Sequence, residues 1–351
     1  MDFSANFDII KILLLGTIAF IMTIALTPIL THFLYKYKLG KQIRSSESAP
    51  IYSKLHAKKS GTPTMGGILI WFTTLILALF FFYLGKITNV PFIEKLNFLT
   101  RPETLLPLGA LVASAIIGLF DDVFNIRKIG PHGGGFTVKH KLLLYTAIAI
   151  FVSYWFYAKL DWDVIHIPFM GNFEIGLWYI PFAIFVIVAT SFSVNETDGL
   201  DGLAGGALLS AFASFAVIAF IQGRFNLATF CVVIVGCLLA FLWFNIPPAR
   251  FIMGDTGSMA LGTTLGIVAM LTNSVIVLPI IGSVLVLESV SVIIQLTSKK
   301  LRKGKKVFIS APIHHHLEAI GWPEPKIVMR FWIISGVTSV LGLILVLVDH
   351  S

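Results

Sequence analysis

Charged residues are scarce in this chain. Only 13% of its 351 residues are Asp, Glu, Lys or Arg, and 56% are hydrophobic, whereas a soluble domain usually carries about a quarter charged residues. The mean hydropathy of +0.88 excludes an ordinary soluble enzyme. Apolar stretches long enough to cross about 30 Å of hydrocarbon recur from end to end, so membrane-spanning helices must form the architecture itself.

Cysteine is nearly absent as well. The two cysteines, Cys231 and Cys237, lie six positions apart in one apolar stretch, which places them on different faces of a helix. Neither a disulfide framework nor a thiolate metal site follows from them. A basic start is also missing before the first apolar stretch, which is too long for the core of a signal peptide. We expect that stretch to remain as the first helix.

Ten apolar stretches predict about ten membrane-spanning helices. No internal repeat or low-complexity linker divides the chain, so a single membrane domain covering residues 1–351 is expected. The predicted fold class is therefore an all-α polytopic membrane protein. The stretches lie near residues 9–35, 65–84, 105–120, 142–158, 177–192, 203–221, 227–244, 258–274, 276–297 and 327–348.

Lysine and arginine concentrate in the odd-numbered connections between these stretches. Because such residues favour the cytoplasmic side, we expect the odd connections in the cytoplasm and both termini outside. The net charge of +8 then reflects membrane orientation, and no nucleic-acid partner is expected. The fourth connection, 163–176, alternates around Gly171-Asn172 and predicts a small external hairpin. The cations of the first connection are Lys36, Lys38, Lys41, Arg44, Lys54, Lys58 and Lys59.

Acidic and amide side chains gather at the helix ends beside the odd connections. One aspartate at a helix end is most simply a cap, but several acids beside hydrocarbon are costly and indicate function. Because they share one membrane face, we expect them to form one site. The group comprises Asp121, Asp122, Asn195, Asp198, Asp201, Asn245 and Asp255.

Two of these segments combine acids with glycine. Asp198 and Asp201 stand three apart between glycines, so both carboxylates can face one site. The run Gly254 to Ser258, GDTGS, opens the eighth stretch, where a helix N-terminus favours an anion. Acids beside phosphate-binding backbone suggest a bridging Mg²⁺, which prefers carboxylate and phosphate oxygens.

A histidine triplet and a basic turn complete the candidate motifs. His314, His315 and His316 cannot all face the same way, and the helically spaced H-E-x-x-H pattern of zinc sites is missing. Contact with phosphate is therefore favoured over zinc. Lys59 and Thr64 border the turn 58–67, KKSGTPTMGG, which serves either as positive-inside charge with a helix start or as part of a nucleotide site.

In order and spacing, these motifs resemble the phospho-N-acetylmuramoyl-pentapeptide transferase family, within the polyprenyl-phosphate N-acetylhexosamine-1-phosphate transferase superfamily. The resemblance covers nearly the whole chain, and the histidine segment is its most discriminating part. The matching segments are GTPTMGG at 61–67, the pair Asp121-Asp122, NETDGLDGLA at 195–204, FNIPPARFIMGDTGS at 244–258 and PIHHHLEAIGWPE at 312–324.

The resemblance implies a reaction, its partners and its location. Phospho-MurNAc-pentapeptide would pass from UDP-MurNAc-pentapeptide to undecaprenyl phosphate with Mg²⁺, giving lipid I and UMP for peptidoglycan synthesis. The enzyme would lie among the lipids of the bacterial inner membrane, with its site facing the cytoplasm, and would form a homodimer. We expect direct attack by the lipid phosphate, with a covalent phospho-aspartyl intermediate as the alternative.

The same resemblance implies roles for individual residues. Asp255 would be the metal ligand, Asp121 and Asp122 would lie at the acceptor phosphate, and His315 would contact the donor. The catalytic set is thus Asp121, Asp122, Asp255 and His315. The substrate-binding set is Lys59, Thr64, Lys141, Asn195, Asp198, Asp201, Asn245, Phe251, His314 and His316.

Three positions depart from the family pattern. Asn125 stands where the family usually has Lys, which leaves Arg127 or Lys128 to supply that cation, while Phe192 and Glu196 replace an expected Asn and Leu in the uridine-binding region. One alternative function is a sister transferase that uses another UDP-HexNAc. Another is a transporter or flippase, but such proteins hold their acids near the midplane rather than at one face.

Overall fold

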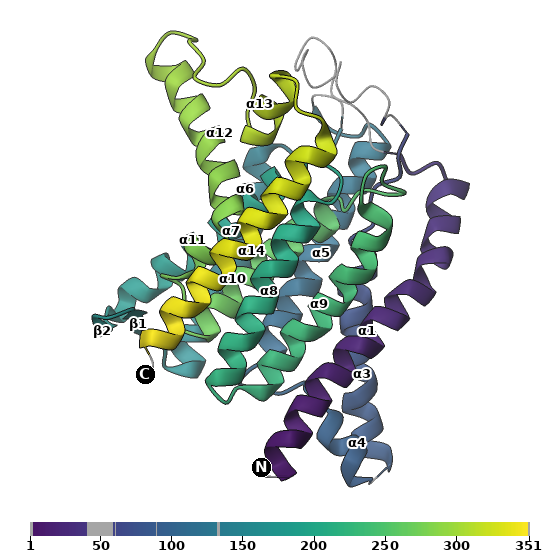
Figure 1. The fold of residues 1–351 in the computed structure, drawn as a ribbon, viewed down its shortest axis with the longest axis vertical. Coiled ribbons are helices and arrows are strands. Elements are labelled where there is room, and N and C mark those ends of the chain that lie inside the picture. The colour runs from purple at the N-terminus through teal and green to yellow at the C-terminus, as the bar shows by residue number, and fades with distance from the viewer. Residues whose placement is uncertain (1–2, 41–58, 60, 89, 132–133, 350–351) are drawn as a thin grey trace.

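The computed structural model describes residues 3–40, 59, 61–88, 90–131 and 134–349; Lys41, Arg44, Lys54 and Lys58 lie outside them. Helices dominate the described part, and a single two-stranded sheet accompanies them (Figure 1), which confirms the all-α fold class. The elements are α1 (Phe3–Lys36), α3 (Ile68–Thr88), α4 (Pro91–Leu96), α5 (Leu105–Ile126), α6 (Val138–Leu160), β1 (Val164–Ile167), β2 (Gly171–Glu174), η3 (Gly176–Trp178), α7 (Tyr179–Thr197), α8 (Leu203–Ile221), α9 (Phe225–Asn245), α10 (Asp255–Leu271), α11 (Leu278–Ile281), α12 (Ser283–Leu301), α13 (Ile313–Ala319) and α14 (Glu324–Asp349).

Eight of the described helices are long and apolar enough to cross a membrane, so the multi-pass architecture is confirmed. The other two expected spans correspond to α10 and α12, which are not among these eight helices. Helix α10 is short, with 17 residues, and α12 carries Glu288 and has Lys299 and Lys300 in its last turn. A count of ten spans and an external position for both termini stay predictions. Both termini do lie at the end of the bundle opposite α13 (Figure 1). The eight helices are α1, α3, α5, α6, α7, α8, α9 and α14.

Helix α10 occupies the centre of the bundle. Every residue from Thr256 to Leu271 is buried, and α5 and α7 supply its most extensive contacts. Small residues allow this close approach: a Cβ on Gly262 would lie 2.7 Å from the Ser191 Cα, and a Cβ on Gly118 would overlap the Asp255 carbonyl. Close packing of this kind holds helices together where lipid supplies no hydrophobic force between them. The start of α10 is therefore fixed between α5 and α7.

The connection between α6 and α7 forms the expected hairpin, but its turn lies elsewhere than predicted. Ile167 pairs with Gly171 and His166 with Asn172, so the Gly-Asn pair belongs to β2. The turn is made by residues 168–170, where Phe169 adopts a φ of 65° and Gly171 follows at 91°. A three-residue turn of this type needs left-handed backbone at its end, which Gly171 provides.

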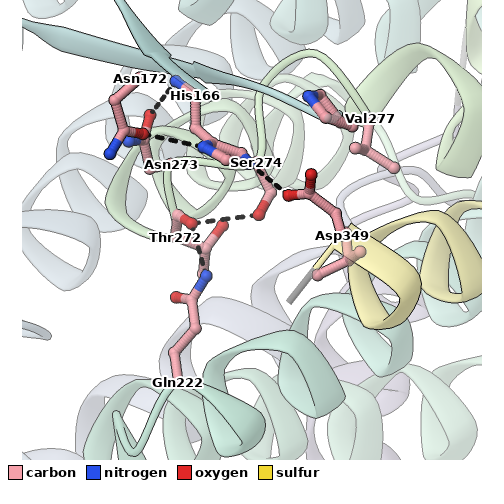
Figure 2. Close-up of a pocket in the computed structure, with 10 residues that line it drawn as sticks. His166, Asn172, Gln222, Thr272, Asn273, Ser274, Val277 and Asp349 are labelled. Carbon is pink, nitrogen blue, oxygen red and sulfur yellow. Dashed lines mark hydrogen bonds and ion pairs between the residues drawn. The ribbon is translucent and has the colours of Figure 1, made fainter. Parts of the chain in front are cut away.

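The hairpin is fastened to the ends of α10 and α14 (Figure 2). The His166 N–H donates to Asn273 Oδ1 at 3.0 Å, the Phe169 N–H donates to Asp349 Oδ1 at 2.6 Å, and His166 Nε2 pairs with the Asp349 carboxylate. His166, Asn273 and Asp349 line a cavity of about 340 Å³, which Gln222 also borders. An external location for this end of the molecule stays a prediction.

Candidate active site

Four aspartates from three segments meet where α10 begins. Gly254 precedes the helix with a φ of 74°, and Asp255 is its first residue. The Asp122 carboxylate accepts the N–H groups of Asp255 and Thr256 at 3.2 and 3.1 Å, and Asp198 accepts the Gly254 N–H at 3.2 Å. Acidic side chains from α5 and from the end of α7 thus satisfy amides at the α10 start that have no partner within the helix.

Lys141 lies between the remaining two aspartates. Its Nζ is 2.8 Å from Asp121 Oδ2 and also pairs with Asp255 Oδ2. Asn195 donates to Asp255 Oδ1 at 3.0 Å and to Ser258 Oγ at 3.1 Å. The side chains of Lys141 and Asp255 keep 17% and 18% of their surface exposed, so the pair is open to a ligand. We call Asp121, Asp122, Asp198 and Asp255, together with Lys141, the acid cluster. Its four carboxylates and one ammonium leave its formal charge negative.

The oxygen groups of this cluster suit Mg²⁺. The Lys141 ammonium, held by Asp121 and Asp255, marks the position between them as one that accepts a cation. Within the described ranges, no three Asp, Glu, His or Cys side chains are arranged to bind a metal on their own. A Mg²⁺ ion here would take one or two carboxylates and complete its shell with water and substrate phosphate, as this ion commonly does.

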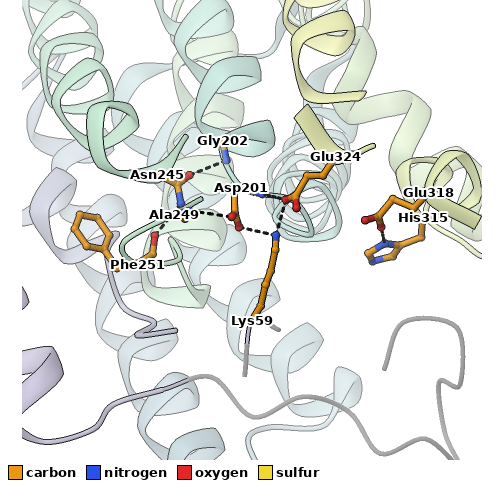
Figure 3. Close-up of polar contacts among 9 residues, drawn as sticks. All are labelled: Lys59, Asp201, Gly202, Asn245, Ala249, Phe251, His315, Glu318 and Glu324. Atoms are coloured by element: carbon orange, nitrogen blue, oxygen red, sulfur yellow. Dashed lines mark hydrogen bonds and ion pairs between the residues drawn. The ribbon is translucent and has the colours of Figure 1, made fainter. Parts of the chain in front are cut away.

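A second polar group surrounds Lys59 (Figure 3). The Lys59 Nζ lies 2.7 Å from Asp201 Oδ1 and 2.5 Å from Glu324 Oε1. Asp201 Oδ2 accepts the Ala249 N–H at 3.0 Å. Burial by itself lowers the pKa of Lys59, but the charges of Asp201 and Glu324 more than offset it and hold that pKa above its ordinary value. Lys59 is therefore charged and held by two carboxylates.

Asn245 and Phe251 shape the backbone beside this group. Asn245 Oδ1 accepts the Gly202 N–H at 2.9 Å, and its Nδ2 donates to the Phe251 carbonyl at 2.8 Å. The Phe251 side chain is fully buried against Phe241 and Phe244. Both residues hold the turn that carries Asp201 (Figure 3).

Asp198 and Asp201 were expected to face one site, but they belong to different groups of contacts. Asp198 contacts Gly254, whereas Asp201 contacts Lys59. Their three-residue spacing does not align them because α7 ends at Thr197 and a turn follows, with Gly202 at a φ of 83°. Thr64 also lies with the acid cluster: a Cβ on Gly254 would come within 2.7 Å of its hydroxyl.

The three histidines point in three directions, as consecutive residues on α13 must. His314 Nδ1 lies 2.9 Å from Glu288 Oε2, and both side chains are fully buried. His315 pairs with Glu318 at 2.7 Å, and His316 Nδ1 accepts the Ile309 N–H at 3.2 Å.

His314 closely approaches the Asp198–Asp201 turn. A Cβ on Gly199 would overlap its imidazole Nε2. His315, the expected donor contact, lies apart from the Lys59 group (Figure 3).

The three departures from the family pattern fall outside the Lys59 group. Phe192 and Glu196 line an apolar groove of about 680 Å³ along α7 and α12. Near Asn125, the cation that meets the acid cluster is Lys141, and neither Arg127 nor Lys128 makes an ion pair with a described carboxylate.

Sequence reasoning assigned no role to Glu324 or Glu288. Glu324 stands directly after Gly-Trp-Pro at a helix start, where a capping role alone accounts for an acidic residue. The sequence signal therefore did not single it out as a site residue.

Comparison with known proteins identifies the class and then the family. The profile described as "Glycosyl transferase family 4" matches residues 104–273, which contain the acid cluster except for Thr64. The helical membrane fold and this match define a membrane-embedded transferase. "Phospho-N-acetylmuramoyl-pentapeptide-transferase signature 1" matches residues 59–70, which contain Lys59 and Thr64.

Curated relatives extend the likeness over nearly the full length. The phospho-N-acetylmuramoyl-pentapeptide-transferase of Chloroflexus aggregans is 39% identical over 356 residues, which cover 98% of this chain and 92% of the relative. Those of Clostridium novyi and Desulforapulum autotrophicum are 38% and 37% identical and cover 93% of this chain, and 94% and 90% of the relatives. The chain belongs to the phospho-N-acetylmuramoyl-pentapeptide transferase family.

Proposed function

We propose that this protein transfers phospho-MurNAc-pentapeptide from UDP-MurNAc-pentapeptide to undecaprenyl phosphate, giving lipid I and UMP. The observation that carries the proposal is the acid cluster at the α10 start, where Lys141 is held by Asp121 and Asp255. Its carboxylates and one ammonium provide the charges that position a phosphate and a divalent cation. The Lys59 group supplies a second cation beside it for the nucleotide donor.

The chemistry is an exchange of one pyrophosphate linkage for another. An oxygen of the lipid phosphate attacks the sugar-proximal phosphorus of the donor, and the bond from that phosphorus to the bridging oxygen breaks, so UMP leaves with that oxygen. The Lys141 ammonium, held between Asp121 and Asp255, would attract and orient a phosphate, and Asn195 fixes the Asp255 carboxylate. Mg²⁺ held by Asp255, with Asp121, would neutralise phosphate charge.

The remaining assigned residues bind the donor. Lys59 and Asp201 would contact the nucleotide, and the turn held by Asn245 and Phe251 would form its floor. Among the other assigned side chains, Asp122 and Asp198 hold the backbone at the α10 start, while Thr64 and His314 lie close to Gly254 and Gly199. A donor contact by His315 or His316 is proposed on family resemblance.

The apolar groove beside α7 suits the lipid acceptor. It runs along α7 and α12, with Phe185 and Ile293 among its apolar walls and Ser193 and Glu196 toward the end of α7. That end of α7 also carries Asn195, so a polyprenyl chain in the groove would present its phosphate to the acid cluster. Because Glu196 stands where the family pattern has Leu, this end of the groove is more acidic than the family pattern predicts.

The site would face the cytoplasm of the bacterial inner membrane. Cations flank the site end, including Lys36 at the end of α1, Lys128 after α5 and Lys300 at the end of α12, and lysine and arginine favour the cytoplasmic side. The donor is a soluble nucleotide, which matches that orientation. Homodimer formation is proposed on family resemblance.

UMP release by the purified full-length protein tests the proposal. In detergent with UDP-MurNAc-pentapeptide, undecaprenyl phosphate and Mg²⁺, UMP should appear only when both substrates are present, and EDTA should stop its release. The Asp255→Asn variant should release at least about a hundredfold less, because it loses both a carboxylate charge and its pairing with Lys141. Release from UDP-GlcNAc but not from the pentapeptide donor would assign the sister reaction instead, and trapping of a phospho-aspartyl enzyme would refute direct attack.

A further inference from the structure

Glu324 joins three segments that are remote in sequence. It is the first residue of α14, and its Oε1 accepts from Lys59 Nζ at 2.5 Å and from the Asp201 N–H at 2.7 Å. Lys59 itself reaches Asp201 Oδ1 at 2.7 Å (Figure 3). One carboxylate oxygen thus fixes both an ammonium and the backbone of the turn that carries the ammonium's other partner.

Helix α14 contacts the same turn a second time. Eight residues after Glu324, Trp332 Nε1 donates to the Gly202 carbonyl at 3.0 Å. A side chain at Gly206 would overlap the Trp332 indole. Residues eight apart lie on one face of a helix. The first turns of α14 therefore form a wall against which the Asp201–Gly202 turn rests.

We propose that Glu324 is a positioning residue for the nucleotide part of the donor. It acts through Lys59 and Asp201, whose relative position it sets; the inference rests on the proposed function. Without Glu324, the Lys59 ammonium keeps one carboxylate partner instead of two, and the Asp201 N–H loses its acceptor. The acid cluster at the α10 start has its own partners, so the chemical step should be affected much less than donor affinity.

Binding of UMP to the full-length protein in detergent isolates this effect. By isothermal titration calorimetry, Glu324→Ala should weaken UMP binding at least about tenfold, because Lys59 and the Asp201 N–H both lose the charged acceptor that fixes their positions. The KM for UDP-MurNAc-pentapeptide should rise by a similar factor, with kcat and the KM for undecaprenyl phosphate within about threefold. Glu324→Gln, which keeps an acceptor oxygen but loses the charge, should fall between. Glu174→Gln, at an exposed position on β2, is the matched control.

A double-mutant cycle separates positioning from a general loss of stability. If Glu324 acts through Lys59, then Lys59→Ala combined with Glu324→Ala should cost UMP binding little more than Lys59→Ala alone. Fully additive losses, or wild-type UMP affinity in both Glu324 variants, overturn the inference and leave the proposed function standing. A wild-type protein that binds no UMP contradicts the proposed function itself. If Glu324→Ala does not fold, the UMP affinity of Glu324→Gln decides, provided that its unfolding midpoint equals that of the wild type. Weaker UMP binding then supports the inference, and wild-type binding overturns it.

Discussion

Asp121 and Asp122 are neighbours in sequence but differ in what they contact. Asp121 pairs with Lys141 and accepts the Phe136 N–H, whereas Asp122 accepts two amides at the start of α10. The first arrangement presents a carboxylate to a cation, and the second supplies a helix cap from another helix. A pair assigned to one catalytic task therefore divides into a charge-bearing and a supporting aspartate.

This division predicts different effects on stability. Asp122→Ala should lower the free energy of unfolding by about 1–2 kcal/mol, because two helix-start amides lose their acceptor. Asp122→Asn keeps one acceptor oxygen and should lose less, and Asp121→Asn should lose least. Thermal unfolding in detergent, followed by tryptophan fluorescence, measures the order. An unfolding midpoint for Asp122→Ala equal to that of the wild type would show that α10 does not need this cap.

His166 carries a pH-dependent part of the stability. Burial lowers its pKa, but hydrogen bonds to Asp349 and Asn172 and the Asp349 charge more than offset burial, so the pKa lies above its ordinary value. A raised folded-state pKa means that the ion pair stabilises fully below about pH 6.5, the unfolded value, and that this contribution disappears as pH rises through the folded-state pKa. The midpoint gap between wild type and His166→Gln should be larger at pH 6 than at pH 9. Equal gaps at both pH values would remove the ion pair as the cause, and Asp349→Asn should reproduce the pattern.

At the scale of elements, the site depends on how closely α5 and α10 approach. Gly118 on α5 faces the Asp255 carbonyl and the Thr256 nitrogen, so a Cβ there would overlap backbone that cannot move aside cheaply. The same helix contains Gly109, around which a Cβ would meet nothing within 4 Å. The two glycines therefore form a matched pair. Substitution by Ala changes the backbone entropy similarly at both positions, but a Cβ meets close backbone only at Gly118.

Gly118→Ala should therefore reduce both UMP release and the unfolding midpoint, whereas Gly109→Ala should leave both unchanged or slightly improved. The expected loss for Gly118→Ala is about 1–3 kcal/mol, as for other overpacked sites, and activity should fall at least about tenfold because Asp255 moves with the α10 start. Both variants are compared by thermal unfolding and by UMP release under identical conditions. Equal behaviour of the two would mean that the α5 and α10 backbones are not in close contact.

At the scale of the whole molecule, the sequence predicts what depends on local composition. The length of apolar stretches follows from bilayer thickness, so the eight apolar helices could be located in advance. The position of Asp255 at a helix start was likewise predictable from Gly254 and the following small residues. The hairpin was predictable from its alternation, although its turn lies at residues 168–170 and not at Gly171-Asn172.

What the sequence could not supply were pairings between remote segments. Lys141 meets Asp255, and Lys59 meets Glu324, across 114 and 265 positions, and no local pattern indicates such partners. The separation of Asp198 from Asp201 depends on where α7 ends, which a boundary prediction does not resolve. The burial of His314 against Glu288 likewise needed α12 and α13 in place.

The arrangement of the whole bundle predicts that its two ends face opposite sides of the membrane. Both native cysteines are fully buried, so an impermeant maleimide should react only with an added cysteine. Lys300→Cys, at the exposed end of α12, should be labelled in inverted membrane vesicles but not in intact cells, because its cationic surroundings favour the cytoplasm. Glu174→Cys, exposed on β2, should be labelled in intact cells. The opposite pattern would invert the proposed orientation and place the acid cluster on the side without nucleotide donor, and labelling of both from one side would contradict the course of the chain through the membrane.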